Sequence, residues 1–391
     1  MAEKSWVASS EEPCAPTWVA GAIAAGVRFY AGYPITPATE IAEFMSRRMF
    51  EVDGTYVQME DELASLNAVI GASATGVKSC TASAGPGMAL IQNELGQAVV
   101  AEVPAVVINV GRAGPGIGNA TRSGQMEVMQ ARYGPNGECP AVAISPATVE
   151  EAFWLTIKAV NLSESLRTVV IVLAEGLLGL QRAVVDLPDD YGAIEITERP
   201  RPSMPPGECS GAYIASELDD VPPIADFGTG YKTILNTVGI QPRGGGDGST
   251  EGGRLENQDF TIRRLHEKIL ARKDDVIMTE RHGIEDAEVV YIAFGTQARS
   301  AVVAMQQARA KGIKAGVLRL ITVWPFPEDA VRECCANARA VVVPEMNLGQ
   351  VRMLVVNALA DHDAKVVGVN HVDSNYILPD EILAKTEEVL P

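Results

Sequence analysis

Residues 78–114, KSCTASAGPGMALIQNELGQAVVAEVPAVVINVGRAG, contain the pattern that decides the fold. Lys78–Ala82 is predicted to be a strand, Met88–Glu102 a helix that follows a turn at 85–87, and Ala105–Val110 a second strand. The second strand is almost continuously apolar, which is typical of a parallel strand that is covered on both faces. The stretch therefore predicts one strand–helix–strand unit of a mainly parallel sheet with helices on both sides.

The same alternation extends from this stretch in both directions. Thr36–Phe50 is predicted to be a helix with Thr36 at the N-cap and Pro37 at the first helical position, where these residue types are favoured. A second pattern of the same kind begins at Ala287 and ends with a strand at Val366–Val369. The remaining elements of the first pattern are strands at Phe29–Tyr33, Thr55–Met59, Val142–Ile144 and Val169–Leu173 and helices at Asp61–Thr75 and 146–165.

The segment between the two patterns has a different composition. Arg199–Gly207 is rich in proline, and Arg243–Gly253 is so rich in glycine that we expect a loop or mobile flap. Asp259–Arg272 has the pattern of an isolated amphipathic helix. We therefore expect an α/β protein with two open parallel-sheet domains, at residues 1–198 and 275–391, and a connector at 199–274.

Composition and charge exclude several classes of function. Hydrophobic residues make up 47% of the 391 residues, enough for a packed core, and the formal net charge is −18. So acidic a chain is poorly suited to bind nucleic acid or an anionic membrane surface, and no apolar stretch is long enough to span a bilayer. The cysteines lack the spacing of a zinc or iron–sulfur site, and scattered thiols without a signal peptide indicate the cytoplasm. They are Cys14, Cys80, Cys139, Cys209, Cys334 and Cys335.

Two glycine-rich motifs do not support the ligands that such motifs often bind. The sequence at Gly114–Asn119 follows a strand but misses the G-x-G-x-x-G pattern by one position, so a nicotinamide or flavin site is not supported. The tripeptide Gly246-Asp247-Gly248 has no strand before it, and we interpret it as a chance match to a diphosphate-binding motif. We therefore assign no metal to this chain.

Polar residues lie where strands are predicted to end, the edge at which parallel α/β sheets bind ligands. Thr36 either caps the following helix, contacts a ligand with its hydroxyl group, or does both. Arg112 either holds a carboxylate in bidentate fashion or forms a surface ion pair. The partial positive charge of a helix N-terminus explains one or two of Glu60, Asp61 and Glu62, while a third, facing small residues, would be buried and available for catalysis.

Taken together, several stretches resemble the alpha subunit of 2-oxoacid:ferredoxin oxidoreductases, with the 2-oxoglutarate branch closest. The resemblance covers nearly the whole chain and is weakest at 200–258. It rests on AGYPITPATEIAEFM (31–45), QMEDELASLNAVIGAS (58–73), ASAGPGMALIQNE (82–94), INVGRAGPGIGN (108–119), GVLRLITVWPFP (316–327) and VVVPEMNLGQ (341–350).

The resemblance implies a fold and a reaction. The first domain resembles the pyrimidine-binding domain of thiamine-diphosphate enzymes, and the last resembles the transketolase carboxyl-terminal domain. The reaction would be the oxidative decarboxylation of 2-oxoglutarate to succinyl-CoA and carbon dioxide, or the reverse carboxylation, with electrons passed to ferredoxin. A separate beta subunit would hold the diphosphate of thiamine diphosphate, Mg²⁺ and a [4Fe-4S] cluster, coenzyme A would be a co-substrate, and further subunits would be possible in some complexes.

The resemblance also gives roles to individual residues. Glu62 takes the place of the catalytic glutamate, whose carboxyl group hydrogen-bonds the aminopyrimidine ring of the coenzyme. Thr36 and Arg112 would hold the substrate carboxylate. The other implied site residues are Pro34, Ser83 and Gly85 near the coenzyme, Ile35 at the substrate, and Asn347 and Gly349 near coenzyme A.

Departures from the family pattern leave the substrate open. The loop at 114–119 is more like that of the branched-chain 2-oxoacid branch, Ala84 stands where serine is usual, and Glu175 replaces a frequent aspartate. Arg122 either neutralises the distal carboxylate of 2-oxoglutarate or faces solvent. The alternatives are an enzyme of the same family for a branched-chain or aryl 2-oxoacid, and a non-catalytic scaffold subunit.

Overall fold

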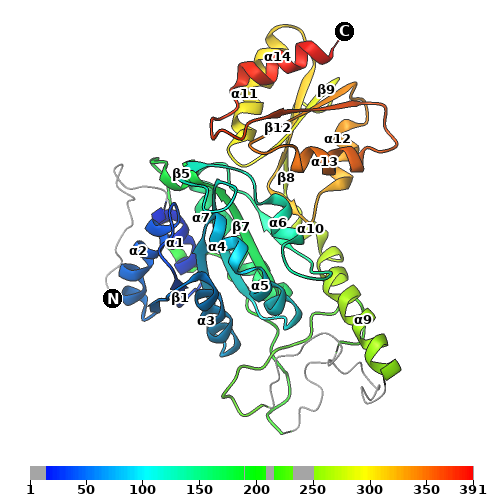
Figure 1. Ribbon diagram of the computed structural model, residues 1–391. Helices are drawn as coiled ribbons and strands as arrows, with labels where there is room; N and C mark the ends of the chain where they lie inside the picture. The colour runs from blue at the N-terminus through cyan, green and yellow to red at the C-terminus, as the bar shows by residue number, and fades with distance from the viewer. Residues whose placement is uncertain (1–14, 189, 208–214, 232–250, 391) are drawn as a thin grey trace.

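Two sheets organise the chain, one above the other in Figure 1. The computed structural model describes residues 15–188, 190–207, 215–231 and 251–390. The strands of the first sheet are β1 (Phe29–Gly32), β2 (Thr55–Gln58), β3 (Ser79–Ser83), β4 (Ala105–Ala113), β5 (Asn119–Ser123), β6 (Val142–Ile144), β7 (Val169–Glu175) and β11 (Thr322–Trp324). Those of the second are β8 (Thr279–His282), β9 (Val289–Phe294), β10 (Ala315–Leu320), β12 (Ala340–Glu345) and β13 (Lys365–Asn370).

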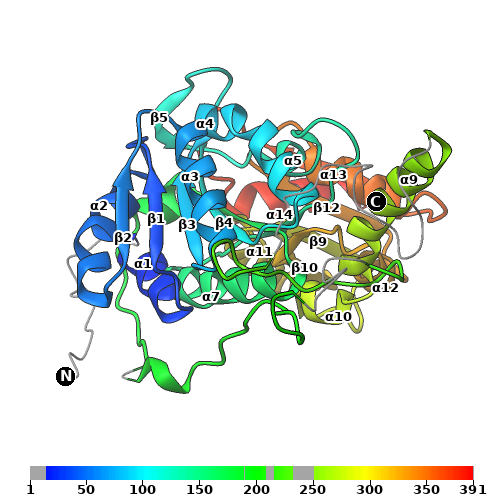
Figure 2. The same cartoon turned by 90° about the horizontal axis from the view of Figure 1, so that it is seen from below.

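The first sheet is parallel except at β5 and β11. Its strand order is β11-β6-β7-β4-β3-β1-β2, with β5 antiparallel to the end of β4. Every residue of β4 is buried, as the apolar sequence predicted. One face is covered by α1 (Ala15–Ala24), α2 (Thr39–Arg48) and α7 (Val149–Leu166), and the other by α3 (Glu62–Ala74), α4 (Gly85–Leu90) and α5 (Gln92–Val100), as Figure 2 shows. Further short elements of this part are η1 (Met49–Val52), α6 (Val128–Tyr133), α8 (Gly176–Leu180) and η2 (Tyr191–Ala193).

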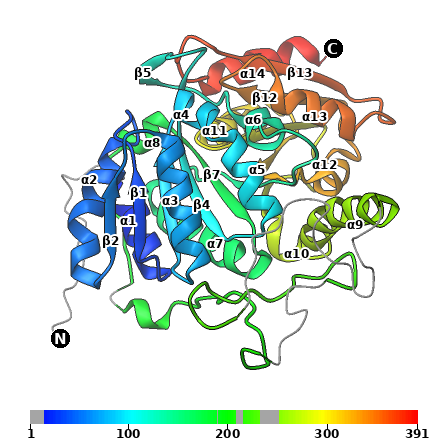
Figure 3. The same cartoon turned by 60° about the horizontal axis from the view of Figure 1, so that its bottom comes forward.

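The second sheet has the order β13-β12-β9-β10-β8 and is parallel except at β8. Its outer face packs against α11 (Gln297–Ala310) and α14 (Pro379–Val389), and α12 (Glu328–Cys335) and α13 (Gln350–Ala358) lie on the inner face. The inner face shares one hydrophobic core with the first sheet, and Figure 3 shows α13 beside α6, where the two units meet. The expected class of two α/β sheet units is confirmed.

Several predicted boundaries are wrong. Helix α2 begins at Thr39 with Ala38 at its N-cap, so Thr36 does not cap it. The predicted turn at 85–87 is the first turn of α4, and the expected single helix at 88–102 is two helices, α4 and α5. Proline and glycine are tolerated there because the first N–H groups of a helix need no partner within it.

The connector helix is not isolated. Helix α9 (Glu251–Leu270) begins inside the stretch expected to be a loop, so that expectation is wrong for 251–253, while 243–250, including the tripeptide at 246–248, lies outside the described residues. Arg264 and Lys268 on α9 are fully buried and bind Glu102 at 2.5 and 2.8 Å. Although burial alone would raise the pKa of Glu102, Lys268 and Arg264 hold it well below its usual range. α10 (Lys273–Val276) then leads to the second sheet. In the described part of the chain no helix has an apolar run that would cross a bilayer.

Candidate functional site

The carboxyl ends of β1, β3 and β4 lie side by side because these strands are parallel neighbours in the first sheet. The segments that follow them are the loop at 33–37, the start of α4 at Gly85, and the loop after Ala113. This edge of the sheet is the usual ligand side of an α/β domain. Most of the residues predicted for the site belong to these segments or to the N-terminus of α3.

Glu62 and Ser83 form a buried polar pair beneath α4. Glu62 is the first residue of α3, and Asp61 caps that helix by accepting a hydrogen bond from the N–H of Ala64 at 2.7 Å. The side chains of Glu62 and Ser83 are 6% and 1% exposed. A Cβ atom on Gly87 would contact the Ser83 hydroxyl group and lie 2.6 Å from Oε1 of Glu62, so both groups converge on this glycine.

Neither group of this pair has a partner within the described part of the chain. The Ser83 hydroxyl group makes no hydrogen bond there. The Glu62 carboxyl group likewise makes no hydrogen bond or ion pair with a described residue. Buried polar atoms usually form hydrogen bonds. The Glu62 carboxyl group and the Ser83 hydroxyl group are therefore suited to bind a polar ligand between them.

Arg112 connects two of the three segments. Its Nη1 donates to the carbonyl oxygen of Thr36 at 2.7 Å and its Nη2 to that of Ile117 at 2.5 Å. Its Nε is buried, has no partner in the described part of the chain, and lies against Gly85, where an added Cβ would be 3.1 Å away. Arg112 is 5% exposed, so it does not form the surface ion pair that was the alternative.

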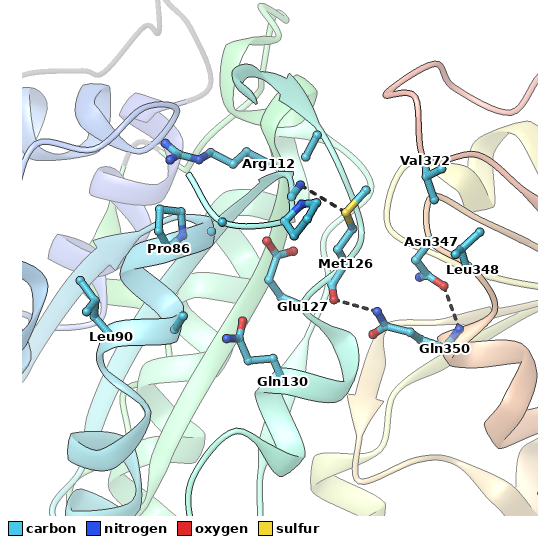
Figure 4. A pocket seen from close by; sticks show the side chains of 16 residues that line it. Pro86, Leu90, Arg112, Met126, Glu127, Gln130, Asn347, Leu348, Gln350 and Val372 are labelled. Atoms are coloured by element: carbon cyan, nitrogen blue, oxygen red, sulfur yellow. Dashed lines mark hydrogen bonds between the residues drawn. The ribbon is translucent and has the colours of Figure 1, made fainter. Parts of the chain in front are cut away.

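A cavity of about 1010 Å³ lies between the two units, beside these residues. One end is lined by Gly85, Pro86 and Arg112, and the opposite end by Asn347 and Val372, as Figure 4 shows. The cavity therefore brings together Gly85, Arg112 and Asn347 of the predicted residues.

Asn347 has a structural task at this cavity. Its amide oxygen accepts hydrogen bonds from the N–H groups of Gly349 and Gln350 at 2.8 Å each, and its amide nitrogen donates to the carbonyl oxygen of Gln125 at 2.8 Å. Gly349 has φ 107°, a conformation that glycine adopts at little cost. Asn347 thus shapes the turn before α13 and fixes it to the first unit.

The other predicted residues are more peripheral. Pro34 and the side chain of Thr36 are exposed, and Ile35 is half-buried against the core below α2. Arg122 is exposed on β5 and pairs with no described residue. Within the described residues, no group of His, Cys, Asp and Glu side chains has the arrangement of a metal site.

The sequence pattern missed Gln125 and Glu127, which lie between β5 and α6. Gln125 is 4% exposed and joins the two units: its Nε2 donates to Glu175 at 2.7 Å and to the carbonyl oxygen of Phe294 at 3.1 Å. Glu127 is 7% exposed and lines the cavity. Neither residue lies in a segment with the hydrophobic periodicity of a helix or strand. The only signal in the sequence that could have marked them as site residues is the polar stretch after the glycine-rich loop.

Glu175 completes the junction that Gln125 makes. Its Oε1 accepts a hydrogen bond from the N–H of Thr296 at 2.9 Å, and its Oε2 accepts one from the Thr296 hydroxyl group. Burial raises the pKa of Glu175 to about 6, against the opposing effect of its bonds to Thr296 and Gln125. The two units therefore meet through a buried polar network directly behind the cavity.

Comparison with protein families finds two matches along the chain. Residues 20–228 match the family described as pyruvate flavodoxin/ferredoxin oxidoreductase, thiamine diphosphate-binding. Residues 287–382 match pyruvate:ferredoxin oxidoreductase core domain II.

Several curated relatives match over almost their full length. The 2-oxoglutarate synthase subunit KorA of Methanothermobacter marburgensis is 39% identical over 93% of this chain and 95% of its own, and that of Methanocaldococcus jannaschii is 40% identical over 93% and 94%. The ketoisovalerate oxidoreductase subunit VorB of Methanothermobacter marburgensis is 33% identical over 95% of both chains.

Solved structures share the fold. The 2-oxoglutarate:ferredoxin oxidoreductase from Magnetococcus marinus, solved with 2-oxoglutarate, coenzyme A and succinyl-CoA bound, is 29% identical, with a TM-score of 0.86 over 97% of this chain. This chain spans 64% of that longer chain. A split gene transketolase, 14% identical with a TM-score of 0.54 over 96% of both chains, shares the fold alone.

Proposed function

Because the chain belongs to the 2-oxoacid:ferredoxin oxidoreductases, as a subunit of such an enzyme, we propose that it works on 2-oxoglutarate and supplies the pyrimidine half of a divided thiamine-diphosphate site. The reaction would be the coenzyme A-dependent oxidative decarboxylation of 2-oxoglutarate to succinyl-CoA, or its reversal. The observation that best supports this is the buried pair of Glu62 and Ser83 at the carboxyl ends of parallel strands, for which the described residues supply no hydrogen-bond partner.

The pair fits an aminopyrimidine. A carboxyl group without a partner can share a proton with a ring nitrogen, and the hydroxyl group beside it can bond a further polar atom of the ring. Gly87 leaves the space between them open, since a Cβ atom there would collide with both. The coenzyme, when bound, supplies the carbanion chemistry of decarboxylation, and Glu62 holds its proton at the ring edge.

Arg112 and Thr36 would hold the substrate carboxylate. Arg112 already lies beside Gly85 at the end of the cavity, with its Nε unpartnered. A carboxylate accepts two parallel hydrogen bonds from a guanidinium group, and such charge-assisted bonds are stronger than those to carbonyl oxygens. Pro34, Ile35 and Gly85 would shape this end, and Arg122 on β5 would approach the distal carboxylate.

The rest of the enzyme would come from other chains. The described residues offer no metal site, so we assign Mg²⁺, the diphosphate contacts and the [4Fe-4S] cluster to a beta subunit, which would also pass electrons to ferredoxin. Exposed apolar side chains near the cavity support such a partner: Leu90, Ile117 and Leu348 are 51%, 80% and 79% exposed. Coenzyme A would enter past the turn of Asn347 and Gly349. The four described cysteines are free and buried, which fits the cytoplasm.

A reconstitution experiment tests this proposal. We expect the chain alone to be inactive and to reduce ferredoxin with 2-oxoglutarate and coenzyme A only after the beta subunit is added. Glu62→Gln should abolish this activity, because glutamine cannot exchange a proton with the coenzyme. Activity of the isolated chain would refute the divided site, and full turnover of the variant would refute the role of Glu62.

A second substrate class has support of its own. The loop at 114–119 and the relationship to the ketoisovalerate oxidoreductase subunit favour a branched-chain 2-oxoacid. Steady-state assays of the assembled enzyme with 2-oxoglutarate and 2-oxoisovalerate separate the two. A higher kcat/KM with 2-oxoisovalerate would replace our choice of substrate without changing the reaction.

A further inference from the structure

The cavity holds one acidic side chain that the proposed function does not use. Glu127 lies between the end lined by Arg112 and Pro86 and the end lined by Asn347 and Leu348, as Figure 4 shows. Its Oε2 lies against the end of β4, because a Cβ atom on Gly111 would be 3.1 Å from it.

No cation of the described residues pairs with this carboxyl group. Arg112, which is nearby, directs its guanidinium group to the carbonyl oxygens of Thr36 and Ile117. Among the described residues, Glu127 has no ion pair and no hydrogen bond to another side chain, and its hydrogen-bond donors are the backbone N–H groups of Met126 and of Glu127 itself. A buried acid without an ion pair to any described residue, at the border of a large cavity, is a candidate for a chemical role.

The surroundings of Glu127 suit a group that exchanges a proton near neutral pH. A small cavity of about 10 Å³ behind it is lined by the apolar side chains of Val128, Leu173 and Phe294 together with the polar side chains of Asn109, Gln125 and Glu175. Burial raises the pKa of Glu127 to about 7, against the opposing effect of the backbone N–H groups of Glu127 and Met126 and of the Arg112 charge. Within the described residues, the charged groups near it are Arg112 on β4 and Glu175 on β7, which lines the same small cavity.

Under the proposed function, on which this inference rests, one proton transfer lacks a residue. The thiol of coenzyme A must lose its proton when its sulfur takes the acyl group, and Glu62 is engaged with the coenzyme at the other side of α4. We propose that Glu127 is the general base that removes the proton from the thiol of coenzyme A. The thiol would enter from the Asn347 end and the acyl group would lie at the Arg112 end, with Glu127 between them.

The step balances in atoms and electrons. The S–H bond of the thiol breaks, an O–H bond forms on Glu127, and the sulfur forms its bond to the acyl carbon as the bond from that carbon to the coenzyme breaks. The proton transfer moves no electrons between molecules. The two electrons of the oxidation leave through the clusters to ferredoxin, the acceptor of the proposed reaction. A carboxyl group with a pKa near operating pH is an efficient base for this purpose.

The experiment separates the two halves of the reaction in the assembled enzyme. Reduction of the iron–sulfur clusters by 2-oxoglutarate without coenzyme A reports the first half, and formation of succinyl-CoA reports the second. Glu127→Gln should leave the first rate and coenzyme A binding, measured by calorimetry, unchanged, and slow the second on the order of 100-fold. Glu127→Asp should restore part of the second rate. Glu150→Gln, the same charge change at an exposed position on α7, is the control.

The pH profile gives a second measurement. In the unaltered enzyme the coenzyme A-dependent rate should rise with pH through about 7, and this limb should be missing in Glu127→Gln. If that variant fails to assemble, the unaltered enzyme still tests the proposal. Its rate should rise with pH through about 7 in the presence of coenzyme A, and cluster reduction without coenzyme A should not show this rise.

Three results would overturn the inference: equal slowing of both halves, no slowing of either, or a coenzyme A-dependent rate without the limb near pH 7. No cluster reduction by 2-oxoglutarate in the unaltered enzyme would instead overturn the proposed function itself.

Discussion

Gly87→Ala should disable the site without changing any charge. The new methyl carbon would lie 2.6 Å from Oε1 and 2.7 Å from Cγ of Glu62, and it would also collide with the Ser83 hydroxyl group. Ordinary contact begins near 3.4 Å, so the Glu62 carboxyl group must shift by about 0.8 Å. A misplacement of about 1 Å in a catalytic geometry typically costs about 100-fold in rate, and we expect a loss of that order in kcat.

The assay is ferredoxin reduction by the assembled enzyme with saturating 2-oxoglutarate and coenzyme A. The matched control is Gly71→Ala on α3, the helix that begins with Glu62, because a Cβ atom there meets nothing within 4 Å. The control should retain full activity and unfold at an equal or higher temperature, since alanine favours a helix by about 0.5–1 kcal/mol over glycine. If a correctly folded Gly87→Ala enzyme had the kcat of the unaltered enzyme, the proposal that the coenzyme binds beside Glu62 would be refuted.

Three further predictions concern specificity and stability. Arg122→Ala should raise KM for 2-oxoglutarate but not for 2-oxoisovalerate, and an equal change in both KM values would contradict a role at the distal carboxylate. Glu102→Gln removes the anion that Arg264 and Lys268 share and should lower the free energy of unfolding in denaturant by about 3–5 kcal/mol, whereas an unchanged midpoint would count against these buried ion pairs. Because burial raises the pKa of Glu175 from 4.5 to about 6, its folded form holds the proton more tightly, and stability should fall by about 2 kcal/mol as pH rises from below 4.5 to above 6. Glu175→Gln should remove this part of the slope in unfolding measurements at pH 4 and pH 7, and identical slopes would disprove the assignment.

Local sequence patterns predicted the buried strands well and the chain's long-range connections poorly. The strand expected at Ala105–Val110 is part of β4. A short, continuously apolar run is typical of a parallel strand that is covered on both faces, so this pattern predicted the strand reliably. The short strand β11 (Thr322–Trp324) escaped prediction, since it leaves the second pattern to pair with β6 of the first sheet. Neither that strand pairing nor the burial of Arg264 and Lys268 against Glu102 can be predicted from local sequence patterns, because the partners are far apart in the chain.

The same distinction applies within the candidate site. The local pattern pointed to Arg112 at a strand end and to the acidic run 60–62 at a helix start, because parallel topology brings such positions to one edge, and the family resemblance then selected Glu62. Thr36 was expected to cap a helix, but its carbonyl oxygen instead accepts a hydrogen bond from Arg112, 76 positions along the chain. Glu127 lay in a segment without periodicity, so only the cavity between the two units revealed it.

Arg112 links these observations into one physical picture of substrate entry. Its guanidinium group already joins the loop of Thr36 to the loop of Ile117 through two carbonyl oxygens. An incoming carboxylate would replace neutral acceptors by a charged one, which strengthens the bonds and favours the exchange. Under the proposed role of Arg112, the two loops would then lose a shared donor, so substrate binding would change the restraint on both of them.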